Sequence, residues 1–565
     1  MVSIAALFIA LIPLFSVNCV QGHDISYHLL RIEALKEGIL SGHPFSKVNF
    51  LFFGGRGYAS SMFYPDALLY FPAILRCLGV SINASYHIFV AACIILSYVS
   101  MYLVVRLITS HFLKEKDDNK GRKVILLRGS DVRARAAGVM AALCYTLSQY
   151  HVDDIYTRAA VGEFTAMIFL PFAIYGLYDI LMGGMKRPAI MALGMAGLIL
   201  THTTTTIFVL VLYVLCFIYA LARRSIRGRL RMAWIMRIVL TAAFVLAVTS
   251  FYWVGALEQF LDARFGSGQG IFDMDYEKLM VFDLFLNRNP AFGIALPLVW
   301  FVAMAFFVYV MGGEKKLRLL SLICSVTAFV FLFGSTGLLP WKYLDSILGF
   351  MQFPWRFLIM STALLSVSAA LAFSSAVHDL DRGLRSGVSV LAVLLVFCVM
   401  AFSFFSNLQR MEKDYYSYSD DYYSYIPFTG SVIGGEWLPV TVKDRDALLK
   451  DCDMAVTDYG GRLQVERSEG GLKVSMPSSA GFVDVPFIYY KGYEARTQEG
   501  RVLELDGSGE NGSVRVYSPP EGIITVRYKG TGAQKASMAV SILAFLAAVF
   551  LYGSQLLFPK RSEGK

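Results

Sequence analysis

Several short stretches place charged and aromatic side chains beside apolar segments, where they could carry acid–base or anion-binding chemistry. The first is GHDISYHLLRIEALKEG at 22–38, which follows an apolar run that begins at Met1. Asp24, His28 and Arg31 are spaced i, i+4 and i+7, which places them on one face of a helix. The apolar residues between them fill the opposite face, so the spacing predicts a helix lying flat on the outer membrane surface. The alternative is an interfacial helix whose polar face simply meets water.

A second stretch, SQYHVDDIYTRAAVGEF, gathers acidic residues around one arginine between two apolar segments. Asp153, Asp154 and Glu163 stand close in sequence to Arg158. Acids at this density beside an arginine suit a pocket for a cation or a polar substrate. The alternative is a solvated hairpin held by a local Asp–Arg pair.

Further candidates stand at other apolar boundaries. Arg56 in GGRG and Tyr64 in FYPDALLYFP could contact a phosphate or a sugar. His202 in LTHTTTT lies either at the floor of a cavity or buried against a threonine hydroxyl. Arg356 in GFMQFPWRFL could bind a lipid phosphate with both arms of its guanidinium. The alternative for Arg356 is an aromatic anchor at the membrane edge with a snorkelling arginine.

The elements that carry these residues belong to a membrane protein. The chain of 565 residues is 56% hydrophobic and 16% charged, with a mean hydropathy of +0.56. That composition indicates a polytopic α-helical membrane protein. The net charge of +9 does not indicate nucleic acid, because the basic residues cluster in short loops between apolar runs. The eight cysteines lie mostly inside apolar runs without a CxxC pair, which argues against disulfides and cysteine metal sites.

Apolar runs predict about twelve membrane helices, because a span needs roughly 20 apolar residues. The first run lacks the basic start of a signal peptide and is expected to stay as a helix. Lysine and arginine in alternate loops place those loops and both termini in the cytoplasm, and put loops 21–85 and 151–162 outside. The expected spans are 1–20, 86–110, 134–150, 163–183, 188–203, 204–222, 234–254, 290–311, 317–335, 355–376, 386–405 and 536–558.

The segment 406–535 has a different pattern. It contains short runs of alternating apolar and polar residues, such as LKVSM and SVRVYS, separated by turn sequences such as GSGENGS. This pattern predicts a small antiparallel β-sandwich-like domain outside the membrane. The expected domains are therefore 1–405, a transmembrane domain with outer loops 21–85 and 151–162, which become the catalytic loops if the protein is an enzyme; 406–535, the extracytoplasmic β-rich domain; and 536–565, the last membrane helix with a basic cytoplasmic tail.

Taken in order, GHDISYH, YTRAAVGE, LTHTTTT and QFPWRF, with the outer β-rich segment, resemble the GT-C membrane glycosyltransferases. Within them, the pattern is most similar to YfhO-like proteins and to the bacterial membrane proteins labelled 6-pyruvoyl-tetrahydropterin synthase-related. The resemblance implies an inverting enzyme of the cell envelope that takes a sugar from a polyprenyl-phosphate donor. It implies Asp24 as the general base, Arg356 as the first phosphate ligand, and Arg158 or Arg56 as the second.

The same resemblance implies that the remaining acids shape the sugar or acceptor pocket, with His28 and Arg31 as neighbours that orient Asp24. The acceptor would be an envelope polymer, a glycolipid or a protein. No cofactor is required, although the acids allow a divalent metal. Two other functions stay open: a transporter or flippase, and a non-catalytic protein that assembles envelope polymers.

Overall fold

The computed structural model describes most of the chain. It covers residues 1–113, 132–222, 229–266, 273–286, 314–378, 380, 382–410, 415–416, 418, 435–468 and 471–557. The chain forms two compact units. Unit 1 comprises Met1–Ile25, Ser81–Ile238 and Phe272–Ser419, and unit 2 comprises Ser26–Val80, Val239–Ile271 and Asp420–Lys565. The domain boundaries expected from the sequence, at 405 and 535, stay predictions.

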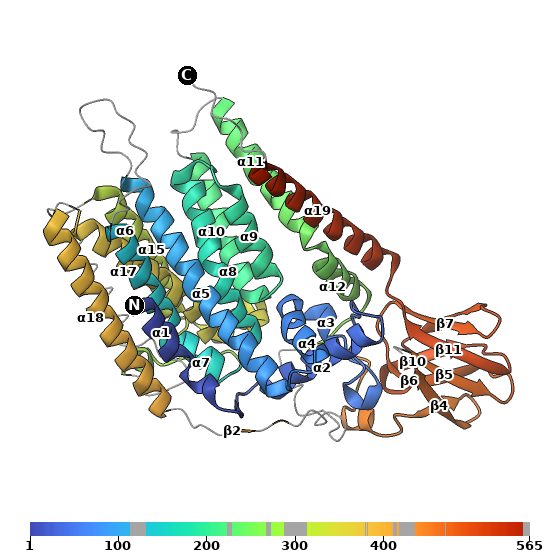
Figure 1. The fold of residues 1–565 in the computed structure, drawn as a ribbon. Coiled ribbons are helices and arrows are strands. Elements are labelled where there is room, and N and C mark those ends of the chain that lie inside the picture. Colours follow the sequence, from blue (N-terminus) through green and yellow to red (C-terminus); the bar gives the residue numbers. More distant parts are fainter. Residues whose placement is uncertain are drawn as a thin grey trace. The chain divides into compact units, whose positions relative to one another are not determined.

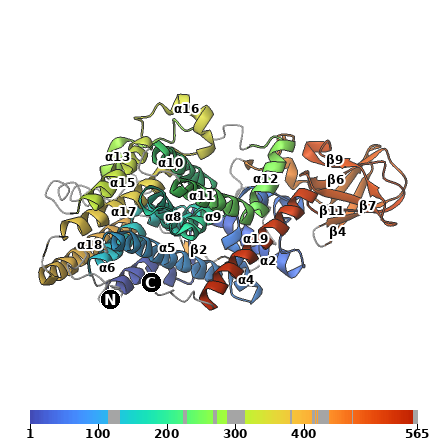
Figure 2. The ribbon, with the colours of Figure 1, turned by 90° about the horizontal axis from the view of Figure 1, so that it is seen from above.

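Unit 1 is a bundle of apolar helices. Figures 1 and 2 show α5, α8, α9 and α10 running side by side. A second group packs α15 against α17, and α6 against α5, α17 and α18. The helices of this unit are α1 (Val2–Leu11), α5 (Ile82–Leu113), α6 (Val132–Thr146), α7 (Gln149–Tyr156), α8 (Val161–Tyr178), α9 (Pro188–Ile199), α10 (Thr203–Ala222), α13 (Val281–Leu286), α15 (Lys315–Gly334), α16 (Trp341–Leu348), α17 (Leu358–Ala376) and α18 (Arg382–Arg410).

Among the described residues, seven helices are long and apolar enough to cross a membrane, or eight if a bent pair is one span. The bent pair is α11 (Arg229–Val248) and α12 (Ser250–Asp262), which meet at 74°. The fold is therefore that of a polytopic α-helical membrane protein. The expected spans at 1–20, 134–150 and 188–203 form shorter helices, and 290–311 lies outside the described residues.

Glycines let α8 and α9 pack closely. A Cβ on Gly194 of α9 would lie 2.3 Å from the backbone nitrogen of Ala173, and one on Gly197 would lie 2.1 Å from the ring of Phe169. Only a residue without a side chain fits at such distances. Small residues at helix contacts are the usual way in which membrane helices approach one another, because burial from lipid supplies little driving force.

Unit 2 contains the β-rich domain that the sequence predicts ahead of the last helix, α19 (Gly532–Leu557). In the described part of this domain, nine antiparallel strands follow the order β8-β7-β11-β5-β4-β3-β6-β10-β9. They are β3 (Met454–Thr457), β4 (Arg462–Ser468), β5 (Gly471–Met476), β6 (Phe482–Ile488), β7 (Tyr493–Thr497), β8 (Val502–Leu503), β9 (Leu505–Asp506), β10 (Ser513–Tyr517) and β11 (Gly522–Tyr528).

Strand β4 gives the sheet its sandwich-like form. Its first residues pair with β3 and its last residues pair with β5, so the strand passes from one half of the sheet to the other. Side chains from both halves, including Val485, Val514, Ile524 and Val526, join one buried core. The β-sandwich-like prediction is confirmed.

The segment 26–80 shares that core, which the sequence did not indicate. Leu30, Val48 and Phe52 pack with the apolar side chains of the strands. The helix α2 (Ile25–Leu40) opens this segment, and the short α3 (Ser60–Phe63) and α4 (Tyr70–Cys77) follow. The last helix, α19, lies against α12 within the same unit (Figure 1).

The close packing of α9 on α8 gives a test of the bundle. We expect Gly194→Ala to destabilise the protein by about 1–3 kcal/mol, because the added methyl group has no space. Gly387→Ala in α18 is the matched control, since nothing lies within 4 Å of a Cβ at that position. Thermal unfolding in detergent should show a lower midpoint for Gly194→Ala and no loss for Gly387→Ala. Equal midpoints for the two variants would contradict the packing described.

Candidate functional site

A buried cluster of charges forms where α7 ends and α8 begins. Ser148 starts α7, its hydroxyl accepting a hydrogen bond from the backbone N–H of His151. Backbone N–H groups of Thr157 and Arg158 close the helix on the carbonyl of Asp153, at 3.0 and 2.9 Å. Ala159 then takes a positive φ of 52°, and this sharp turn brings Arg158 back toward the acids of both helices.

Glu163 joins two arginines from distant parts of unit 1. Its carboxylate accepts from Arg158 Nη2 at 2.7 Å and from Arg356 Nε at 3.1 Å. Tyr150 donates its hydroxyl to the same carboxylate at 2.5 Å. Because Glu163 is only 2% exposed, solvent does not screen its charge, and the carboxylate and the two guanidinium groups compensate one another directly.

Arg158 is held on every side. Besides Glu163 it forms an ion pair with Asp154, and its guanidinium lies 4.0 Å from the ring centre of Trp355. Such a contact between a cation and an aromatic face is favourable, particularly where water is excluded. These three partners hold the Arg158 guanidinium, and therefore its positive charge, in one position.

Arg356 is less completely engaged. Its Nη1 donates to the carbonyl of Met351 at 2.8 Å, and its guanidinium lies 5.2 Å from the ring centre of Phe353. Within the described ranges its Nη2 makes no hydrogen bond. The Arg356 guanidinium therefore keeps N–H donors that could bind an anion. The alternative interpretation, an aromatic anchor at the membrane edge with a snorkelling arginine, accounts only for the contact with Phe353.

The backbone of the α7–α8 turn fixes the residues just before α2. His23 and Asp24 donate their N–H groups to the carbonyls of Thr157 and Arg158, at 3.1 and 2.9 Å. Gly22 lies against Ala159, where a Cβ would approach the Ala159 Cβ to 2.6 Å. Only glycine allows this contact, so Gly22 brings Asp24 beside the charged cluster.

The Asp24 carboxylate is half-buried, and within the described part of the chain it makes no hydrogen bond or ion pair. Burial raises the pKa of Asp24 above its ordinary value, while the charges of Arg158 and Arg356 act in the opposite direction. An unpaired carboxylate with a raised pKa beside cationic groups is suited to accept a proton.

Two further acids and a histidine complete the surroundings. Burial raises the pKa of Asp153 and Asp154 well above their ordinary values, and neighbouring carboxylates raise both further. His202 bonds through Nδ1 to the Thr205 hydroxyl at 2.8 Å, as one of the two sequence interpretations had it. Burial lowers the pKa of His202 to about 3, so its imidazole is neutral.

The acids are not part of a solvated hairpin. Asp153 and Asp154 are fully buried, because α7 packs against α8 and α17. That alternative correctly expected a local ion pair, which Asp154 forms with Arg158, but it wrongly expected the acids to be exposed to solvent. The described residues contain no group of three or more His, Cys, Asp or Glu side chains that could hold a metal ion.

The prediction that Asp24, His28 and Arg31 form the polar face of a helix lying flat on the membrane surface is also wrong. The helix begins at Ile25, so Asp24 precedes it, and His28 and Arg31 are each only 1% exposed. Arg31 donates to the carbonyls of Tyr64 and Pro65, both at 2.9 Å, and lies 4.4 Å from the Tyr64 ring centre. Folding of the segment 26–80 around this arginine buries the polar face together with the apolar one.

Arg56 has partners within unit 2 as well. Its Nη2 donates to the carbonyl of Lys450 at 2.9 Å. The predicted site residues are thus divided between the two units. Unit 2 contains His28, Arg31, Tyr64 and Arg56, and unit 1 contains Asp24, Arg158, Glu163, Arg356, His202 and the two aspartates of α7.

Sequence reasoning missed three contributors. Tyr150 and Trp355 stand in the quoted stretches but were not singled out, although Tyr150 precedes Asp154 by one helical turn. Gly22 was also passed over. Its place directly before His23 and Asp24 was the available signal for a close backbone approach.

Comparison with known proteins gives distant similarities. No protein-family model matches the chain. An uncharacterised protein of Lactococcus lactis subsp. cremoris, strain MG1363, is 21% identical over 96% of this chain and 93% of its own length. The solved structure of arabinofuranosyltransferase AftD from mycobacteria matches 72% of this chain, with a TM-score of 0.44 and 15% identity. The match covers 26% of the length of that protein, so this chain spans about a quarter of it. Such similarities do not place the chain in a family.

The two arginines around Glu163 give a stability test. We expect Glu163→Gln to lower the free energy of unfolding by about 3–5 kcal/mol, because it removes the negative charge that Arg158 and Arg356 share and leaves Arg158 with Asp154 alone. Glu494→Gln is the matched control, since Glu494 is half-buried and bridges Arg496 and Lys529, which are both exposed to solvent. Denaturation in detergent should separate the two variants clearly. A Glu163→Gln protein as stable as Glu494→Gln would show that the buried cluster contributes little.

Proposed function

We propose that the protein is a membrane glycosyltransferase that moves a sugar from a polyprenyl-phosphate donor to an acceptor, with inversion at the anomeric carbon. The observation that carries the proposal is the position of Asp24, an unpaired carboxylate held by backbone hydrogen bonds beside Arg158 and Arg356. A base next to fixed positive charge is what this reaction requires. The order of sequence motifs that resembles GT-C enzymes supports the same class.

In the proposed reaction Asp24 accepts the proton of an acceptor hydroxyl as that oxygen attacks the anomeric carbon. The bond from the anomeric carbon to the phosphate oxygen breaks, and its electron pair leaves with the polyprenyl phosphate. The products are a glycoside and a polyprenyl phosphate, with the proton on Asp24. Because phosphate is already a good leaving group, the protein has to supply mainly a base, positioning and positive charge.

Arg356 is the proposed phosphate ligand. Its free Nη2 and its 14% exposed side chain distinguish it from the enclosed Arg158. Arg158 then acts through Glu163, by fixing the carboxylate on which the Nε of Arg356 rests. We further propose that this site and the β-rich domain face the extracytoplasmic side, as the distribution of basic loops indicates. Envelope polymers, glycolipids and proteins are the proposed acceptors.

Removal of the proposed base gives the first functional test. We expect Asp24→Asn to reduce sugar transfer about 10²–10⁴-fold, because the amide cannot accept the proton. The measurement is polyprenyl phosphate released from a panel of polyprenyl-phosphate hexoses and pentoses, with envelope membranes as acceptor. Asp275→Asn, a carboxylate paired with Lys278 at the surface, is the matched control. Transfer at the normal rate by Asp24→Asn would refute the assignment. Movement of a solute across vesicles, without turnover of any donor, would favour a transporter instead.

The effect of Arg356 on Asp24 gives a pH test. Asp24 acts as a base only when deprotonated, so the rate falls as the pH falls through its pKa. Because Arg356 lowers that pKa, Arg356→Gln should raise it and move the acid limb of the pH–rate profile to higher pH. Arg356→Lys keeps the charge and should leave the limb closer to that of the unmodified protein.

The control is Arg385→Gln, since Arg385 likewise donates to backbone carbonyls, those of His378 and Leu380. An acid limb that stays in place in Arg356→Gln, or moves to lower pH, would separate Arg356 from Asp24.

A further inference from the structure

Unit 2 contains a cavity that the proposed transfer site does not use. It has a volume of about 430 Å³, inside the range of roughly 300–1,000 Å³ that is usual for small-ligand pockets. The cavity lies where the end of α12 meets the loops of the sheet, and an isolated bridge between Phe265 and Pro439 joins the two. Its walls therefore come from segments far apart in the sequence.

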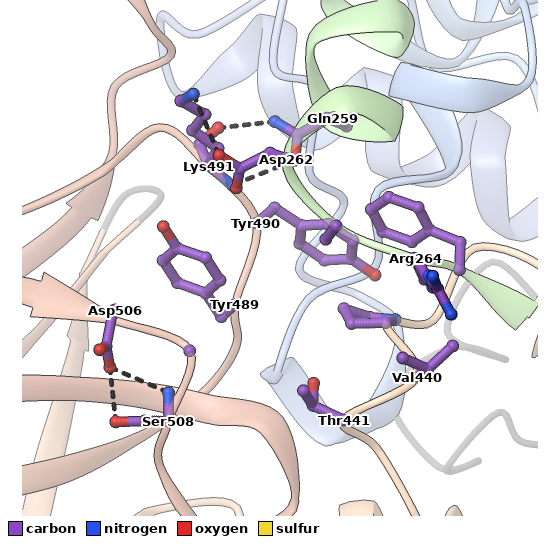
Figure 3. Close-up of a pocket in the computed structure, with 14 residues that line it drawn as sticks. Gln259, Asp262, Arg264, Val440, Thr441, Tyr489, Tyr490, Lys491, Asp506 and Ser508 are labelled. Atoms are coloured by element: carbon purple, nitrogen blue, oxygen red, sulfur yellow. Dashed lines mark hydrogen bonds and ion pairs between the residues drawn. The ribbon is translucent and has the colours of Figure 1, made fainter.

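The aromatic ring of Tyr489 lines this cavity. Figure 3 shows the half-buried ring of Tyr489 between Asp262 and Lys491 on one side and Asp506 and Ser508 on the other. A Cβ on Gly507 would lie 2.6 Å from Cδ1 of Tyr489, so the glycine allows the ring to pack directly on the backbone. The ring is thereby fixed with an apolar face and a polar hydroxyl available.

The polar groups on both sides of the ring are held in place. Gln259 and the backbone of Lys491 exchange two hydrogen bonds, at 2.7 and 3.1 Å, and the Lys491 Nζ lies 3.0 Å from Asp262 Oδ1. Asp506 accepts from the backbone N–H and the hydroxyl of Ser508, at 2.9 and 2.6 Å, and from the Tyr517 hydroxyl at 3.1 Å. A carboxylate has about four acceptor positions, so Asp506 keeps about one for a ligand and Asp262 keeps more.

Among the described residues, the charges of the cavity balance. Asp262 and Asp506 oppose Lys491 and Arg264, and these are the ionisable acids and bases, apart from the tyrosines, that the described part of the chain places in its wall. A phosphate or nucleotide would need an excess of positive charge, and a cation would need an excess of negative charge. A neutral ligand rich in hydroxyl groups fits better, since each hydroxyl both donates and accepts.

We propose that this cavity binds a sugar residue of a neutral oligosaccharide, with the Tyr489 ring against the sugar face and Asp262 and Asp506 accepting from its hydroxyls. That this glycan is the acceptor or product chain rests on the transferase function proposed above. The cavity would then hold the growing chain through residues that take no part in the proposed transfer step.

The test measures binding of labelled neutral oligosaccharides to the full-length protein in detergent, without any donor. The probes are linear arabinan, galactan, glucan and mannan fragments, and we expect at least one to bind with a Kd of about 0.1–1 mM. Tyr489→Ala should weaken that binding by about tenfold or more. Ser508→Trp is the second variant, because Ser508 is exposed at the cavity wall and the larger side chain fills the space.

Tyr459→Ala is the matched control, since Tyr459 is an exposed tyrosine of the same domain outside the cavity. It should bind as the unmodified protein does. No binding by any neutral probe, or equal binding by Tyr489→Ala, Ser508→Trp and Tyr459→Ala, would overturn the proposal. Preferential binding of a phosphorylated glycan or a nucleotide would overturn it too.

The two proposals fail independently. If Asp24→Asn transfers sugar normally while glycan binding depends on Tyr489, only the transfer mechanism is wrong. If transfer depends on Asp24 but no glycan binds at Tyr489, only the cavity assignment is wrong.

Discussion

The bridge that Glu163 makes between Arg158 and Arg356 is the interaction on which the candidate site depends. Arg158 belongs to the α7–α8 turn, and Arg356 belongs to the short helix Pro354–Phe357 that leads into α17. Burial of so much charge is costly, and it is tolerated because each guanidinium finds carboxylate, carbonyl or aromatic partners. The bridge thereby joins two segments of unit 1 that are far apart in the sequence, the α7–α8 region and Pro354–Phe357.

The same turn explains how Asp24 differs from the other acids. Its backbone N–H donates to the carbonyl of Arg158, and that of the neighbouring His23 donates to the carbonyl of Thr157, while the Asp24 carboxylate stays unpaired in the described structure. Asp154 and Glu163, by contrast, use their carboxylates to hold Arg158. Asp153 also lacks a hydrogen-bond partner for its carboxylate among the described residues, but it is fully buried, whereas Asp24 is half-exposed. Pairing and burial together therefore assign different roles to chemically similar side chains, and Asp24 is the unpaired acid that a substrate could reach.

Much of the fold could be predicted from the sequence, because hydropathy and alternation act locally. The long apolar runs form helices, and the alternating runs after 450 form strands ahead of α19. The pairing of Arg158 with a nearby acid was also within reach, since the two are one helical turn apart. The pairing of Arg356 with Glu163 was not, because it joins residues 193 positions apart. Nor did the charge pattern of 24–31 reveal that the carbonyls of Tyr64 and Pro65 would enclose Arg31.

The central claim is that Arg356 holds the donor phosphate while Asp24 faces the reacting carbon. A structure of the protein with a non-hydrolysable polyprenyl phosphonate sugar tests it most directly. The account predicts density for the phosphonate beside the Nη2 of Arg356, with the anomeric carbon turned toward the acceptor position next to the Asp24 carboxylate. A phosphonate bound away from Arg356, or a sugar whose anomeric carbon is out of reach from the Asp24 side, would contradict it.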